Sequence, residues 1–142
     1  MNTPLLRRFT EVTNSTPTGR KSAVRALQAW QILIAKASNR QIIRYEHLQR
    51  LMDYPDARPL STILTHVMHL CRAWKLPPLT VIVVNRDGTP GEGFTDVPRV
   101  EFDHWREQVF DENWFNIVPP TVDQFHAAWR EATGVALMDD SA

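Results

Sequence analysis

The sequence predicts a mainly helical fold with one small β element. Three segments, 22–37, 44–52 and 60–74, repeat apolar residues at the spacing of three and four that an amphipathic helix requires. One β-branched run, "TVIVV" at 80–84, follows a proline pair and precedes the turn-forming stretch "NRDGTPGEG". A chain of 142 residues is long enough to bury a hydrophobic core in a single domain.

The N-terminal third predicts an arm and two helices. Residues 1–20 are rich in Thr, Ser, Asn and Pro, a composition typical of a flexible arm. The helix at 22–37 has its apolar stripe at Val24, Leu27, Trp30 or Gln31, Ile34 and Ala37. The shorter helix at 44–52 is expected to turn Leu48, Leu51 and Met52 inward before Pro55 and Pro59 end it.

The helix predicted at 60–74 has the clearest division into two faces, and Pro59 fits its first turn. Its apolar stripe comprises Leu60, Ile63, Leu64, Val67, Leu70, Cys71 and Trp74. Its opposite face carries the polar residues Ser61, Thr62, Thr65, His66, His69 and Arg72. Because a solvated helix face normally mixes Glu with Lys, the absence of acids favours a surface that faces a polyanion.

The β-branched run at 79–85 predicts a buried strand, and "NRDGTPGEG" predicts the turn or wing after it. Beyond it, "HWREQVFDENWF" and "TVDQFHAAWREATG" predict two short helices, with Thr121 as N-cap and Gly134 as C-cap. Their packing faces comprise Trp105, Val109, Trp114, Phe125 and Trp129. Core packing is the default expectation for all the tryptophans, and Trp114 with Phe115 is the best candidate for an exposed aromatic contact. Residues 139–141 are expected to fray.

The net charge of zero hides two unlike halves. Residues 1–75 contain twelve Lys or Arg and four Asp or Glu, whereas residues 76–142 contain four and twelve. A basic half of +8 suggests a polyanionic partner, and an acidic half of −8 suggests a protein contact or a competitor for the basic surface. The single cysteine, the lack of a signal peptide and the lack of a membrane-length apolar run predict a cytoplasmic protein with no membrane partner.

The order of helix, short helix, proline turn, longer helix, strand and glycine-rich turn is that of a winged helix-turn-helix. This interpretation divides the chain into an arm (1–20), a winged helix (21–94) and an acidic, Trp-containing helical extension packed on the same domain (95–142). The stretch from Arg25 to Gly93 resembles the C-terminal DNA-binding domain of O6-alkylguanine-DNA alkyltransferases and alkyltransferase-like proteins. The resemblance lies in the central Trp of the first helix, the Tyr of the short helix, the "AR" that opens the next helix, and "LPPLTVIVVNRDGTPGEG".

In that family the tyrosine helps to rotate a nucleotide and the arginine fills the gap left in the duplex, and Tyr45 and Arg58 stand at these positions. The family's enzymes carry a Pro-Cys-His-Arg motif where this chain has "PPLTVIVV", so Leu79 or Thr80 replaces the acceptor cysteine. Neither side chain can accept an alkyl group at neutral pH, and Cys71 belongs to an apolar stripe. The sequence therefore predicts a non-enzymatic protein without a cofactor.

Three other patterns have simpler explanations. His66 and His69 have a spacing that a metal pair could use, but no third ligand is near in sequence. Asp103 beside His104 is expected to be a surface pair, because adjacent residues point to different sides of a helix. "DGTPGEG" lacks the Lys-Ser/Thr of a phosphate loop.

The sequence thus predicts a non-catalytic protein that binds double-stranded DNA, either as a sensor of modified DNA or as a regulator. The expected duplex contacts are Tyr45, Arg58, Ser61, Thr62, Thr65, His66, His69 and Arg72, with Arg44, Arg50 and Arg86 on phosphates. The alternative is a protein-interaction module that binds a partner or dimerises through the acidic, aromatic C-terminal half, because a fold does not fix a function.

Overall fold

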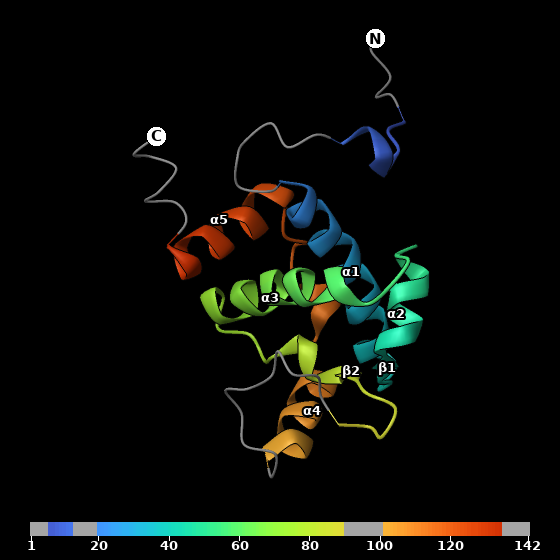
Figure 1. Cartoon of the computed structure of the whole chain (residues 1–142). Coiled ribbons are helices and arrows are strands. Elements are labelled where there is room, and N and C mark those ends of the chain that lie inside the picture. Colours follow the sequence, from blue (N-terminus) through green and yellow to red (C-terminus); the bar gives the residue numbers. More distant parts are fainter. Residues whose placement is uncertain (1–5, 13–19, 90–100, 135–142) are drawn as a thin grey trace.

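The computed structural model describes residues 6–12, 20–89 and 101–134, and its architecture is mainly helical with one small sheet (Figure 1). The helices are α1 (Arg20–Ser38), α2 (Tyr45–Leu51), α3 (Arg58–Ala73), α4 (Phe102–Asp111) and α5 (Val122–Thr133). The described residues also contain the 3-10 helices η1 (Phe9–Glu11), η2 (Leu79–Ile82) and η4 (Trp114–Asn116). The strands β1 (Ile43–Arg44) and β2 (Val83–Val84) form a two-stranded parallel sheet. The predicted mainly α fold with a small β element is confirmed.

The core lies where α1, α3 and α5 pack on one another. Its centre is an aromatic cluster in which the ring of Trp30 meets the rings of Trp114 and Phe125 edge-on, at centroid distances of 5.5 and 6.0 Å. The indole N–H of Trp114 donates to the carbonyl of Val109 at 2.7 Å, which satisfies the polar atom of this buried ring. Because η4 and α5 supply two of the three rings, the C-terminal elements complete the core that α1 begins.

The predicted inward stripes of the first two helices need correction. In α1 the fully buried residues include Ala23, Ala26 and Leu33, whereas Val24 and Leu27 are only half-buried. Small alanines are buried here because α1 packs against two helices, α3 and α5, at close range. In α2, Leu48 and Met52 are buried as predicted, but Leu51 is 52% exposed because it ends the helix on the solvent side.

The strand predicted at 79–85 is wrong over its first half. Leu79–Ile82 form η2, which the N–H of Val81 closes by bonding to the carbonyl of Pro78 at 3.0 Å. Only Val83–Val84 pair, because the partner strand β1 is itself two residues long. The predicted burial is confirmed from Leu79 to Val84.

A tight turn follows β2, as predicted. The N–H of Asn85 bonds to the carbonyl of Thr89 at 2.8 Å, and Gly88 adopts a left-handed φ of 84° that suits glycine. Residues 90–94 of the predicted wing lie outside the described residues.

The caps predicted for α5 are both confirmed. The hydroxyl of Thr121 accepts the N–H of Gln124 at 3.1 Å, and the Gln124 side chain accepts the N–H of Thr121 at 2.9 Å. Gly134 ends the helix with a φ of 76°. Of the predicted packing residues, Val109, Trp114 and Phe125 are buried, whereas Trp105 and Trp129 are half-buried. The predicted frayed end at 139–141 lies outside the described residues.

Among the residues that the structure describes, no helix is both long enough and apolar enough to span a bilayer.

Candidate nucleic-acid interface

The helix α3 buries one side and presents the other to solvent. Six inward residues are buried, Leu60, Ile63, Leu64, Val67, Leu70 and Cys71, and Trp74 just beyond the helix is half-buried. Pro59 occupies the first turn as predicted. We define the α3 face as the outward residues Arg58, Ser61, Thr62, Thr65, His69 and Arg72, of which Arg58, Ser61, Thr62 and Arg72 are exposed and the other two partly so. The 16 residues of α3 include no Asp or Glu, so this face combines hydrogen-bonding groups with positive charge.

His66 does not belong to this face, contrary to the prediction. Its side chain is buried at 1% exposure, and its ring stacks on that of Trp129 from α5, with centroids 4.9 Å apart and planes 5° from parallel. Its Nδ1 lies 2.7 Å from the carbonyl of Thr62 in the preceding turn. Burial lowers the pKa of His66, which favours the neutral ring. The residue therefore joins α3 to α5 and cannot reach DNA without opening that contact.

His66 and His69 belong to no candidate metal site within the described part of the chain. The described residues contain no group of three His, Cys, Asp or Glu side chains able to hold a metal ion.

Arg58 stands at the first turn of α3 with its side chain 90% exposed. Its guanidinium binds the carboxylate of Asp56 at two points, with Nε–Oδ1 at 3.0 Å and Nη2–Oδ2 at 2.8 Å. The same carboxylate accepts the backbone N–H of Arg58 at 2.9 Å. These hydrogen bonds lower the pKa of Asp56 to about 2, so the carboxylate stays ionised at neutral pH and holds the guanidinium at the start of the helix.

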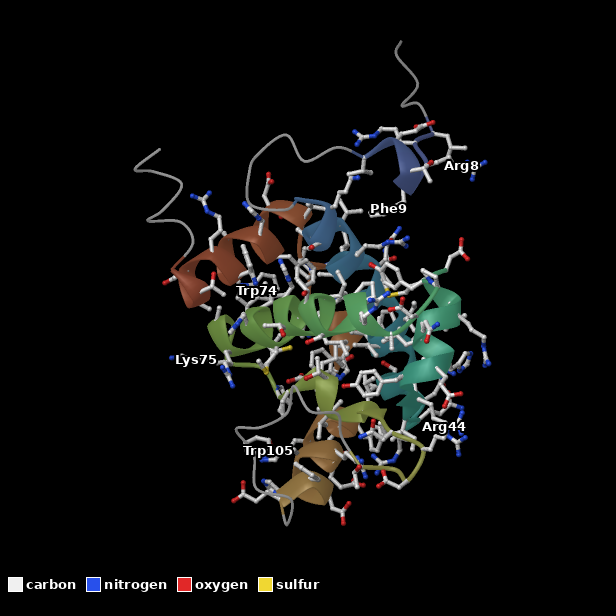
Figure 2. All side chains as sticks on the ribbon, viewed as in Figure 1. Arg8, Phe9, Arg44, Trp74, Lys75 and Trp105 are labelled. Carbon is white, nitrogen blue, oxygen red and sulfur yellow. The ribbon has the colours of Figure 1, made fainter. Side chains whose placement is uncertain are left out.

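A second basic group surrounds α2, and we call it the α2 cluster: Arg44, Glu46, Arg50 and Arg86. Arg86, in the turn after β2, reaches back to Glu46 with Nε–Oε1 at 2.6 Å. The pKa of Glu46 is lowered first by Arg86 and then by the charges of Arg44 and Arg50. Three cations therefore surround one carboxylate, and the cluster keeps a surplus of two positive charges. Figure 2 shows Arg44 on the side of the molecule that carries the sheet.

Tyr45, which the sequence places at the duplex, is only partly exposed. It begins α2, is half-buried and packs against the hydrophobic core. Its ring is thus held by the protein interior, in contrast to the exposed Arg58.

The two residues at which the resemblance would place an acceptor cysteine are buried. Leu79 is fully buried and Thr80 is 7% exposed, and the Thr80 hydroxyl has no hydrogen-bond partner among the described residues. Cys71 is also buried, and burial raises the pKa of its thiol to about 12. None of the three side chains supplies a thiolate at neutral pH.

The remaining sequence candidates separate into core and surface. Trp114 is buried, which confirms the default expectation of core packing and excludes it as an exposed contact, whereas Phe115 beside it is 67% exposed. His104 lies 3.2 Å from the side-chain nitrogen of Gln108, and Asp103 lies 3.7 Å from Arg106. Asp103 and His104 thus contact different residues and do not form an acid–base pair.

No protein family model, curated protein or solved structure matches this chain. The case for a function therefore depends on the chemistry of the α3 face and the α2 cluster.

Proposed function

We propose that this is a non-catalytic DNA-binding protein in which α2 and α3 act as the helix-turn-helix of a winged helix and α3 faces the duplex. The observation that carries the proposal is the composition of the α3 face, which exposes hydroxyl, imidazole and guanidinium groups and no carboxylate of its own helix. A helix face that contacts only water tolerates Asp and Glu side chains. A face that contacts phosphates does not, because like negative charges repel.

Each part of the surface suits one kind of DNA contact. Ser61, Thr62 and Thr65 are short enough to let α3 approach a groove. The hydroxyls of Ser61 and Thr62 can donate to base edges or phosphates, whereas the Thr65 hydroxyl donates to the Ser61 carbonyl at 2.7 Å. Arg58 lies at the helix N-terminus, the end that helix-turn-helix proteins direct toward bases. Its planar guanidinium can donate to two acceptors at once. Arg44 and Arg50 of the α2 cluster are placed to neutralise phosphates beside the groove.

The resemblance to alkyltransferase-like proteins further suggests modified DNA as the ligand. The test measures fluorescence anisotropy of the pure protein with three labelled oligonucleotides of one sequence: duplex, single strand, and duplex with one O6-methylguanine. Four phosphate contacts, from Arg44, Arg50, Arg58 and Arg72, predict that log K for the duplex falls with log salt with a slope of about −3 to −4. A stronger affinity for the methylated duplex supports a sensor, and equal affinity supports a regulator. No duplex binding at low salt refutes the proposal.

A second candidate function, protein binding, is favoured by one observation. Phe115 and Val118, in the segment between α4 and α5, are 67% and 83% exposed, which is unusual for large apolar side chains so close together. If they form a dimer or partner contact, sedimentation velocity of the pure protein will show association that Phe115→Ser abolishes. A monomer at all concentrations excludes the dimer.

A further inference from the structure

The guanidinium of Arg25 lies between two aromatic rings from distant parts of the chain. Its Cζ atom is 3.8 Å from the ring centroid of Phe9, in η1, and 4.8 Å from that of Tyr54, in the turn between α2 and α3. Both distances are within the range of a cation–π contact. We call this arrangement the Arg25 sandwich.

The sandwich attaches the segment 6–12 to the folded domain. Phe9 is half-buried there, and Val12 is 9% exposed. Within the segment the N–H of Glu11 bonds to the carbonyl of Arg8 at 2.9 Å, and the N–H of Arg8 donates to the Glu11 carboxylate at 3.2 Å. A segment with these bonds and a half-buried ring has a defined position on the surface.

The other ring of the sandwich is also fixed. The N–H of Tyr54 bonds to the carbonyl of Gln49 at 3.1 Å, and the Gln49 side-chain amide donates to the carbonyl of Tyr54 at 3.2 Å. Tyr54 precedes Arg58 by only four residues. The sandwich therefore couples the N-terminal segment to the turn that sets the start of α3.

Two exposed arginines lie next to this anchor. Arg7 and Arg8 directly precede Phe9, and neither forms an ion pair with another residue in the described part of the chain. Figure 2 shows Arg8 and Phe9 at the end of the molecule away from Trp105, on the side where the chain passes from α2 to α3. The Arg25 sandwich thus places two positive charges on the same side of the molecule as the turn that leads into α3.

We propose that Arg7 and Arg8 bind the phosphodiester backbone of DNA next to the site that the α3 face contacts, and that the Arg25 sandwich holds them in place. This inference rests on the proposed function and extends the DNA footprint beyond α2 and α3. Basic N-terminal arms add affinity to helix-turn-helix proteins by reaching along the duplex. Because Phe9 already holds the segment 6–12 on the domain, that segment loses less conformational entropy on binding than a free segment would.

The experiment compares three full-length variants with wild type on one unmodified duplex across a salt series: Arg7→Ala/Arg8→Ala, Phe9→Ala, and the triple variant. Loss of two phosphate contacts is expected to make the slope of log K against log salt shallower by about 2. Phe9→Ala keeps the charge and is still expected to weaken binding several-fold, because it releases the arm. The triple variant is expected to bind like the double variant, since both changes remove the same contact.

The matched controls are Lys36→Ala/Arg40→Ala, which removes two charges from the opposite end of α1, and Phe115→Ala, which removes an exposed ring elsewhere. Melting curves exclude misfolding, and if Phe9→Ala does not fold, the Arg7→Ala/Arg8→Ala slope alone decides. If wild type binds and Arg58→Ala weakens it, but the arm double variant has the slope of its control, the arm inference is overturned and the proposed function stands. If wild type does not bind duplex DNA, both proposals fail.

Discussion

Asp56 and Arg58 form a two-point ion pair at the start of α3, and the same carboxylate accepts the Arg58 backbone N–H. Asp56 occupies the Nε and Nη2 donors of Arg58, so a phosphate that approaches this edge of the guanidinium has to displace the carboxylate. If the proposed function holds, Asp56 competes with DNA while it also holds Arg58 at the helix start.

Asp56→Asn is expected to strengthen duplex binding by about two- to fivefold, the scale on which exposed ion pairs act. The amide oxygen can still accept the backbone N–H, while the competing charge is removed. Anisotropy titrations at low salt measure the change. Asp111→Asn, on α4, removes an equal charge far from α3, and an equal gain in both variants would mean that only net charge matters.

Arg58→Ala is expected to weaken duplex binding by about tenfold or more, because a base-edge fork or a phosphate contact at the helix start is lost. Arg40→Ala is the control, because Arg40 already binds Glu107 at 2.6 Å and Asp111 at 3.1 Å. Binding isotherms with melting curves decide the comparison. Equal small losses in both variants would favour the protein-binding function.

Alkyl transfer is expected to be absent. Leu79 or Thr80 stands where the resemblance places an acceptor cysteine, and burial raises the pKa of the Cys71 thiol to about 12, so Cys71 supplies no thiolate at neutral pH. Intact-mass spectrometry after incubation with O6-methylguanine DNA is expected to show no gain of one methyl group. Iodoacetamide is expected to modify Cys71 only after unfolding, which serves as the positive control. Stoichiometric methylation would contradict the non-enzymatic assignment.

Phe125→Ala is expected to lower the free energy of unfolding by about 3–5 kcal/mol, the usual cost of removing a buried phenyl ring. Phe125 is fully buried against Trp30, so the change leaves a cavity where α5 meets α1. Phe115→Ala, with its ring 67% exposed, is expected to change stability by less than about 0.5 kcal/mol. Urea denaturation compares the two, and similar small losses would mean that the C-terminal elements do not complete the core.

The elements that sequence reasoning predicted well are those with strong local signals. The long apolar stripe of α3, the Thr121 cap and the Gly134 cap all depend on residues within a few positions of one another. The errors arise where contacts between distant parts of the chain determine the secondary structure. Leu79–Ile82 are rich in β-branched and aliphatic residues, yet the two-residue partner β1 offers no longer ladder, so they form η2.

In the candidate site, too, local signals predict some residues correctly and distant contacts decide the others. The face formed by Arg58, Ser61, Thr62 and Arg72 follows from helical spacing, and the structure exposes all four. His66 was assigned to that face because its partner Trp129 lies more than sixty residues away, and nothing local indicates that α5 covers it. The sequence does not predict that the segment 6–12 attaches to the domain, because Phe9 among polar residues is a weak signal until its contact with Arg25 is known.

Stability is expected to fall as the pH drops below about 6.5, because the fold keeps His66 neutral. Burial is the main cause of its lowered pKa, and positive charge on His126 or His69 would lower it further, while the hydrogen bond to the Thr62 carbonyl opposes this. The unfolded chain binds a proton near the ordinary pKa of about 6.5, so between that value and the lower folded pKa the unfolded state holds more protons. The contribution of the neutral His66 to the free energy of unfolding is therefore complete above pH 6.5 and is lost as the pH falls toward the folded pKa.

His66→Phe tests this, because phenylalanine can keep the stack on Trp129 but cannot titrate. Melting temperatures measured from pH 8 to pH 5 are expected to fall less for this variant than for wild type. His104→Gln is the control, since it also removes one imidazole, but from an exposed position on α4. If His66→Phe loses as much stability on acidification as wild type does, another group carries the pH dependence. In that case protonation of His66 does not weaken the α3–α5 contact.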